Sequence, residues 1–186
     1  MNSGLEDLEI EIKYEVKKHY DLGERILGQE FLLNGTGGEK NSFLDFDNRL
    51  GEIKTRLRIR EYCNEVIGTI KRNGKISQEG VKSIPEKNIG FKDTLENTIG
   101  FFRWFGAEET KYYEKENRDT YLGEGGYVIC VDTILDRGRL RYFVEVEGPK
   151  NKGVIRCVEK IGLLEKKFEA RVVRESYYEM FAKKRK

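Results

Sequence analysis

The sequence predicts an α+β protein in which an antiparallel sheet of about eight strands closes into a barrel that helices cover. Three observations support this fold class. Many short segments alternate apolar and polar residues, a few segments show helical spacing, and glycine-rich stretches separate them. Closure of such a sheet removes its unpaired edges. Because the sequence contains no internal repeat and no long linker, residues 1–186 are expected to form a single domain.

The elements follow from these patterns in chain order. The first strand is expected at 8–16, where apolar residues alternate with Glu and Lys. Further strands are expected at 43–46, 55–61, 66–71, 76–84, 108–113, 118–122, 127–132 and 141–147. Helical spacing is found at 22–33, 94–105, 152–161 and 174–182. If the polar faces of the strands point inward, these helices are needed to cover the apolar outer faces.

The composition narrows the class of protein. Lys and Arg number 35 against 33 Asp and Glu, so the net charge is only +2. This balance, without an RNP-type motif, argues against a specific nucleic-acid partner. No apolar run is long enough to span a membrane, and residues 1–7 lack the features of a signal peptide. Three cysteines without CxxC spacing are expected to be reduced thiols, which favours a cytoplasmic location.

Charged residues recur two apart in several strands, which places them on shared faces. The shared faces carry Glu9, Glu11 and Lys13; Arg56, Arg58 and Arg60; Thr69 and Lys71; and Glu145 and Glu147. Any one such face is the ordinary wet side of a half-buried strand. Agreement among several strands instead favours a cavity with acidic and basic walls.

Such a cavity suits one kind of ligand. Mg²⁺ and Mn²⁺ prefer oxygen ligands, which Glu9, Glu11, Glu145 and Glu147 can supply. Arginine forks match phosphate oxygens in pairs, and lysines add point charges. The P-loop pattern GxxxxGK[ST] is absent, and a single histidine rules out a catalytic histidine pair. The pattern therefore favours a divalent metal and a polyphosphate ligand.

In its motifs the chain resembles the CYTH family, which groups class IV adenylyl cyclases, thiamine triphosphatases and inorganic triphosphatases. Glu9-Ile10-Glu11-Ile12-Lys13 matches the family's ExExK signature. The later motifs follow in the family's order: Phe43-Leu44-Asp45, Leu57-Arg58-Ile59-Arg60-Glu61, Thr69-Ile70-Lys71, Arg118 with Tyr121, Val131-Asp132 with Gly138, Phe143-Val144-Glu145-Val146-Glu147, and Ser176-Tyr177. The resemblance thus spans nearly the whole chain.

The resemblance implies an eight-stranded antiparallel tunnel with a polar lumen. It implies metal ligands at Glu9, Glu11, Glu145 and Glu147, and phosphate contacts from Lys13, Arg58, Arg60, Lys71 and Arg118. Arg56 shares the face of the other arginines and is added to the phosphate contacts. Of these residues, Glu11, Lys71 and Arg118 are the expected catalytic residues, together with Asp132, which would organise a cation or the attacking water. A homodimer is expected by analogy alone.

Two positions depart from the family pattern. The strand after the T-x-K motif carries only Glu79, followed by Glu86, where relatives are rich in glutamate. The lysine expected two residues before Arg118 falls on Glu116, and Lys115 is out of phase with Arg118 unless a bulge intervenes.

The leading hypothesis is metal-dependent hydrolysis of a triphosphate-bearing small molecule, which is inorganic triphosphate, a nucleoside triphosphate or thiamine triphosphate. An alternative is class IV adenylyl cyclase activity, in which the same phosphate grip serves ATP and releases cyclic AMP and pyrophosphate. A second alternative is a polyphosphate- or nucleotide-binding module without turnover. The sequence leaves these three alternatives open.

Overall fold

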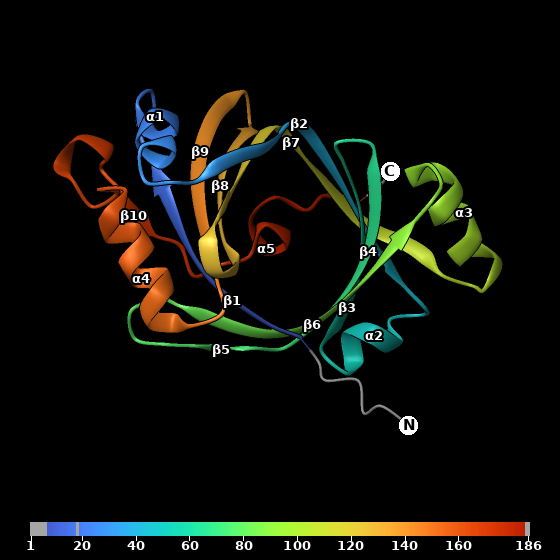
Figure 1. The fold of residues 1–186 in the computed structure, drawn as a ribbon. Helices are drawn as coiled ribbons and strands as arrows, with labels where there is room; N and C mark the ends of the chain where they lie inside the picture. The colour runs from blue at the N-terminus through green and yellow to red at the C-terminus, as the bar shows by residue number, and fades with distance from the viewer. Residues whose placement is uncertain (1–6, 18, 185–186) are drawn as a thin grey trace.

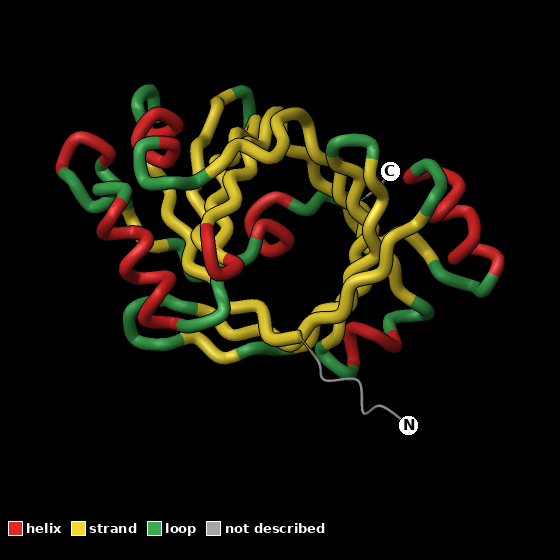
Figure 2. The backbone as a smooth tube through the Cα atoms, viewed as in Figure 1, coloured by secondary structure: helices red, strands yellow, loops and turns green. Residues whose placement is uncertain are grey.

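A ring of antiparallel strands forms the body of the molecule, seen in a computed structural model that describes residues 7–17 and 19–184 (Figure 1). The ring consists of β1 (Asp7–Val16), β2 (Leu32–Asp45), β3 (Thr55–Tyr62), β4 (Glu65–Arg72), β6 (Lys82–Phe91), β7 (Glu108–Gly123), β8 (Tyr127–Asp136) and β9 (Arg139–Glu147). Their order is β1-β9-β8-β7-β2-β3-β4-β6, and pairing of β1 with β6 closes the barrel. The predicted closed antiparallel barrel is confirmed. Figure 2 shows the strands arranged in a ring.

The remaining described elements are short. They are the strands β5 (Lys75–Ile76) and β10 (Arg171–Val172), the helices α1 (Leu22–Leu27), α2 (Arg49–Glu52), α3 (Leu95–Trp104), α4 (Asn151–Lys160) and α5 (Tyr177–Phe181), and the 3-10 turns at Glu124–Gly126 and Lys166–Phe168. β5 extends the sheet beside β6, and β10 lies beside β1. No described helix has the length and apolar character required to cross a bilayer.

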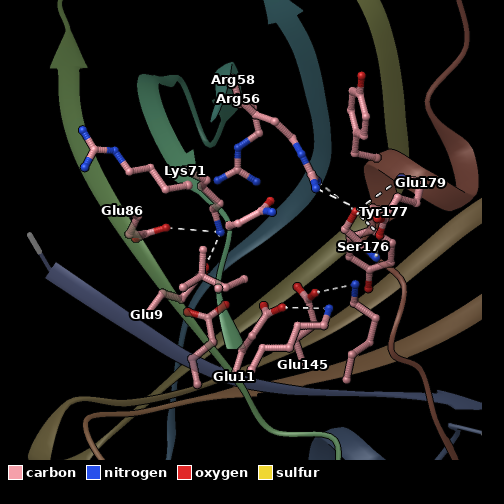
Figure 3. A pocket seen from close by; sticks show the side chains of 18 of the residues that line it. Glu9, Glu11, Arg56, Arg58, Lys71, Glu86, Glu145, Ser176, Tyr177 and Glu179 are labelled. Carbon is pink, nitrogen blue, oxygen red and sulfur yellow. Dashed lines mark hydrogen bonds and ion pairs between the residues drawn. The ribbon is translucent and has the colours of Figure 1, made fainter. Parts of the chain in front are cut away.

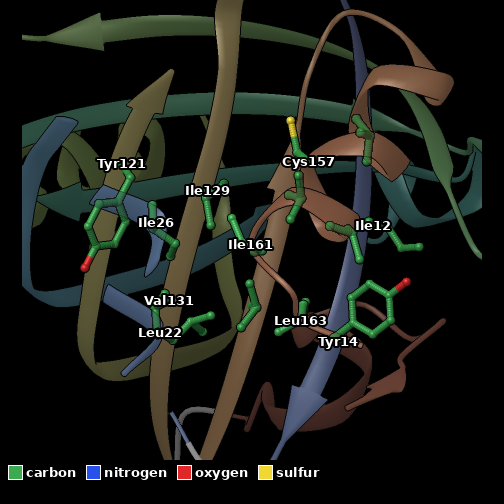
Figure 4. Packing of buried hydrophobic residues seen from close by; sticks show 14 of the residues in the cluster. Ile12, Tyr14, Leu22, Ile26, Tyr121, Ile129, Val131, Cys157, Ile161 and Leu163 are labelled. Carbon is green, nitrogen blue, oxygen red and sulfur yellow. The ribbon is translucent and has the colours of Figure 1, made fainter. Parts of the chain in front are cut away.

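Helices cover the outer face of the barrel, as the alternating strands require. The outward Ile12 of β1 and Ile129 of β8 pack with Leu22 of α1 and Cys157 of α4 in one buried cluster (Figure 4). A second cluster joins Leu57 and Ile59 of β3 to Ile99 of α3. Burial of these apolar side chains outside the barrel leaves the polar faces of the same strands directed into the lumen.

The helix α5 lies inside the ring of strands rather than outside it (Figure 1). Tyr177 and Phe181 of α5 pack against Phe43, Tyr113 and Phe143, which belong to three different strands. A capping box at Ser176 begins the helix. The C-terminal segment therefore fills one part of the lumen with apolar contacts.

Several of the predicted elements are wrong in extent. The strand predicted at 76–84 is interrupted by a turn at 77–81 and covers only the end of β5 and the start of β6. The helix predicted at 22–33 ends at Leu27, and the strand predicted at 43–46 is the last part of the long strand β2. The strands predicted at 108–113 and 118–122 are one continuous strand, β7. The signal-peptide prediction concerns residues 1–7, of which 1–6 lie outside the described part of the chain. The homodimer and the cytoplasmic location stay predictions.

Candidate functional site

The inner faces of the strands enclose one cavity of about 460 Å³. Strand register decides which charged residues meet there. β1 pairs with β9 so that Glu11 lies opposite Glu147, and Lys13 lies opposite Glu145. β3 pairs with β4 so that Arg56 lies opposite Lys71. The polar faces predicted from the period-two pattern thus converge on one lumen.

Three of the four predicted metal ligands lie together. Glu9, Glu11 and Glu147 each offer a carboxylate oxygen within 4.8 Å of the others. Burial, together with the charges of Glu11 and Glu147, raises the pKa of Glu9 to about 8, although Lys71 opposes this shift. Burial also raises the pKa of Glu147. These shifts mark a cluster whose negative charge is incompletely compensated, which fits a divalent cation such as Mg²⁺ or Mn²⁺.

Glu145 stands apart from this cluster, although the sequence groups it with the metal ligands. Its carboxylate lies 3.2 Å from Lys13 Nζ and 3.3 Å from Arg118 Nη2. Burial by itself would raise the pKa of Glu145, but Lys13, Lys115 and Arg118 hold it well below its usual range. Glu145 is therefore placed to hold lysine and arginine side chains rather than a metal ion.

The predicted arginine row extends along β3 on the wall opposite the glutamates (Figure 3). Arg56 donates to Ser176 Oγ at 3.1 Å, and Arg58 donates to Thr69 Oγ1 at 3.4 Å. Among the described residues, the buried Nε atoms of Arg58 and Arg60 have no hydrogen-bond partner. Unpartnered buried donors are costly, so these guanidinium groups are suited to an anionic ligand.

Lys71 links the two walls of the cavity (Figure 3). Its ammonium forms an ion pair with Glu9 and lies 3.2 Å from Glu86 Oε2. Burial alone would lower the pKa of Lys71, but the charge of Glu9 outweighs it and raises the pKa to about 12. Glu86 thus reaches the lumen, whereas Glu79 is exposed in the turn before β6.

A β-bulge in β7 explains how Lys115 takes the place in the lumen that the motif spacing assigns to position 116. β2 advances two residues, from Gly37 to Glu39, while its partner β7 advances three, from Arg118 to Lys115. The extra residue in β7 brings Lys115 and Arg118 to the same buried face and leaves Glu116 exposed. Lys115, and not Glu116, therefore lines the cavity.

Asp132 of β8 lies behind the cations and does not line the cavity. Its carboxylate accepts hydrogen bonds from Lys115 Nζ at 3.0 Å and from Tyr177 Oη at 2.8 Å. Arg118 Nε lies 3.6 Å from the other oxygen. Of the two roles expected for Asp132, this position suits organising a cation.

Sequence reasoning missed Lys82, which lines the cavity, and two buried polar residues behind its lining, Glu39 and Asn41. Lys82 of β6 is buried and lies 3.2 Å from Glu11 Oε1. Glu39 and Asn41 of β2 are buried and hydrogen-bonded to each other at 2.9 Å. Their two-residue spacing is the signal that could have revealed them, had the long strand β2 been recognised.

No family model matches the chain, and no curated protein matches it. Solved structures share its fold. A Hippeastrum protein, proposed to be an adenylyl cyclase and described as having a dominant triphosphatase activity, has a TM-score of 0.69 at 20% identity over 93% of this chain and 94% of that one. A proposed adenylate cyclase from Vibrio parahaemolyticus has a TM-score of 0.69 at 18% identity, covering 95% and 98%. A conserved hypothetical protein of Pyrococcus furiosus has a TM-score of 0.68 at 18% identity, covering 93% and 99%.

Proposed function

We propose that this chain is a triphosphate tunnel enzyme of the CYTH type, which hydrolyses a triphosphate-bearing small molecule with the help of a divalent metal. One observation carries the proposal. A row of partly buried arginines, two of which have buried Nε donors without a partner among the described residues, faces a carboxylate cluster across a cavity. Guanidinium donors of this kind match phosphate oxygens, and clustered carboxylates match the metal that accompanies polyphosphates.

The metal would be Mg²⁺ or Mn²⁺, and Glu9, Glu11 and Glu147 would hold it. These are hard oxygen donors, and metal binding would release the proton that Glu9 retains near neutral pH. The bound metal would supply charge neutralisation for the transferred phosphoryl group. Glu145 is proposed to position basic side chains instead of the metal, because it already pairs with Lys13 and Arg118.

The phosphate chain would lie between the walls of the cavity. Arg58 and Arg60 offer their Nε donors along one side, and Lys71 reaches from the same side toward the carboxylates. Lys13 and Arg118 close the other side. Fixed lysine and arginine side chains around the phosphates stabilise the charge that develops as the phosphoryl group is transferred, because they need no reorganisation during the reaction.

Arg56 has a different position from its two neighbours. Its guanidinium donates to Ser176 and lies 4.9 Å from the centre of the Tyr178 ring. It therefore connects β3 to the C-terminal segment while still lining the cavity. We place Arg56 at the edge of the phosphate site, where it would contact an outer phosphate or the group attached to it.

A turnover screen tests the proposal. The protein is incubated with Mg²⁺ or Mn²⁺ and inorganic triphosphate, ATP or thiamine triphosphate, while orthophosphate, pyrophosphate and cyclic AMP are quantified. Orthophosphate release supports the hydrolase and ranks its substrates. Cyclic AMP and pyrophosphate from ATP would instead assign the cyclase activity. Binding of a triphosphate without any product would favour the binding module. If the protein shows no binding and no turnover of any triphosphate, the proposal is refuted.

A further inference from the structure

Glu39 is a buried carboxylate in the middle of the barrel wall that the proposed chemistry does not use directly. It belongs to β2, and its side chain is 0% exposed. It does not line the cavity. A charge in such a place is costly unless cations and hydrogen bonds compensate it, so its contacts indicate its purpose.

Each oxygen of Glu39 is engaged. Oε1 lies 3.1 Å from Lys115 Nζ and accepts a hydrogen bond from Asn41 Nδ2 at 2.9 Å. Oε2 accepts a hydrogen bond from Arg118 Nη1 at 3.1 Å and lies 3.8 Å from Arg60 Nη1. One carboxylate thus joins cations that come from β7 on one side and from β3 on the other.

The bulge in β7 makes this arrangement possible. Lys115 and Arg118 are three residues apart and share a face only because of the extra residue opposite Gly38. Glu39 pairs directly with Lys115 at the edge of that bulge. Its carboxylate therefore ties together two side chains that regular strand geometry would direct to opposite faces.

Electrostatics agree with a permanently charged carboxylate. Burial by itself would raise the pKa of Glu39, but Lys115, Arg118 and Arg60 hold it well below its usual value. Those same cations line the cavity, whereas Glu39 lies behind them. The carboxylate can therefore fix where their donors point without meeting a ligand.

We propose that Glu39 is a positioning residue that sets the placement of Arg118, and with it Lys115 and Arg60, for the transferred phosphoryl group; this rests on the proposed function. The guanidinium of Arg118 also lies near Glu145 and Asp132, at 3.3 and 3.6 Å. Without the charge of Glu39, Arg118 turns toward these carboxylates. Its charge stays in the lumen, but its donors no longer face the phosphate.

This mechanism predicts a split between turnover and binding. Glu39→Gln is expected to lower kcat by about 100-fold, since a displacement of about 1 Å in a catalytic group has an effect of that size. Affinity for the triphosphate, measured by calorimetry in chelator, is expected to stay within about threefold, because the lumen loses no cation. In an Arg118→Lys background, which lacks the guanidinium fork, Glu39→Gln is expected to have little further effect on kcat.

Glu15→Gln is the matched control. Glu15 also pairs with two arginines, Arg141 and Arg171, yet it does not line the cavity. Its loss is expected to lower the melting temperature and leave kcat unchanged. An unchanged kcat in Glu39→Gln, or an equal loss of kcat in both Arg118 backgrounds, would overturn the inference.

A crystal structure of Glu39→Gln separates this inference from the proposed function. The guanidinium of Arg118 is expected to move by about 1 Å or more from its place beside residue 39. If Arg118 stays in place, Glu39 does not position it, whatever the activity. If Arg118 moves but the wild-type protein neither binds nor turns over any triphosphate, the proposed function fails and the positioning contact stands.

Discussion

Four glutamates of β1 and β9 share the inner face of the barrel, yet their surroundings divide them. Glu145 is paired with cations and has a depressed pKa, whereas Glu9 and Glu147 have raised pKa values. Glu11 lies with the latter two and also pairs with Lys82. The same residue type on the same face thus serves cation placement in one case and is suited to metal binding in the other.

The raised pKa of Glu9 predicts a pH dependence in metal-free protein. The pKa of Glu9 in the folded state is about 8, whereas a glutamate in the unfolded chain loses its proton near its ordinary pKa of 4.5. The contribution of this proton to the free energy of unfolding is therefore fully present below the unfolded-state pKa. It is lost as the pH rises toward the folded-state pKa of about 8. The loss is at most about 1.4 kcal/mol of unfolding free energy per pH unit.

Thermal unfolding in chelator from pH 5 to 8 checks this expectation. Glu9→Gln cannot titrate, so its melting temperature is expected to fall less over this range than that of the wild type. Glu15→Gln is the control, because arginine contacts outweigh burial and lower the pKa of Glu15, which puts its titration below this window. Parallel curves for wild type and Glu9→Gln would contradict the assignment.

At the scale of elements, the bulge between β2 and β7 decides which cations enter the lumen. Gly37 beside it has a φ of 147°, a backbone region that other residues rarely adopt. Gly37→Ala is therefore expected to cost about 1–3 kcal/mol of unfolding free energy. It is also expected to weaken triphosphate binding, because Lys115 and Arg118 depend on the local register. Denaturant unfolding and calorimetry measure the two effects.

Gly90→Ala provides the comparison for that prediction. A Cβ at Gly90 meets no atom within 4 Å, and this glycine does not have a positive φ. Its substitution is expected to change the unfolding free energy by no more than about 0.5 kcal/mol. Equal costs for the two alanine variants would show that the conformation at Gly37 does not constrain the bulge.

Much of the barrel was predictable because its strands separate apolar and charged faces. Ile10 and Ile12 alternate with Glu9, Glu11 and Lys13, which gives the barrel an apolar outer face and a charged lumen. This pattern fails where both faces are polar or small. β2 contains three glycines, and it has no apolar side chain from residue 34 to residue 42, so no alternation of apolar and polar residues marks this part of it as a strand.

Local pattern also could not predict contacts between distant strands. Glu39 and Lys82 are ordinary charged residues in the sequence, and their burial follows from barrel closure. The spacing of Lys115 and Arg118 indicates a shared face only once the bulge is known. Ion-pair partners in the lumen therefore depend on tertiary register rather than on any short motif.

At the scale of the whole molecule, closure of β1 on β6 and the placement of α5 turn separate charged faces into one enclosed site. Buried cations with unpartnered donors destabilise a folded protein until an anion satisfies them. A bound triphosphate is therefore expected to stabilise the fold strongly. At 100 times its dissociation constant, a ligand adds about 2.7 kcal/mol, which corresponds to a rise of roughly 5–10 °C in melting temperature.

Differential scanning fluorimetry in chelator measures this rise without turnover. Sulfate at equal ionic strength is the control, since it carries less charge and spans less of the cavity. An equal shift with sulfate, or no shift with any triphosphate, would show that the arginine row does not form a polyphosphate site.

The carboxylate cluster and the arginine row are expected to act together on one triphosphate. The most direct measurement is orthophosphate release from inorganic triphosphate with Mn²⁺, compared between wild type, Glu11→Gln and Glu15→Gln. We predict turnover in the wild type and in Glu15→Gln, and a loss of at least about 100-fold in Glu11→Gln with its fold retained. Full activity in Glu11→Gln would show that hydrolysis proceeds without the carboxylate cluster, and the proposed joint action would then be wrong.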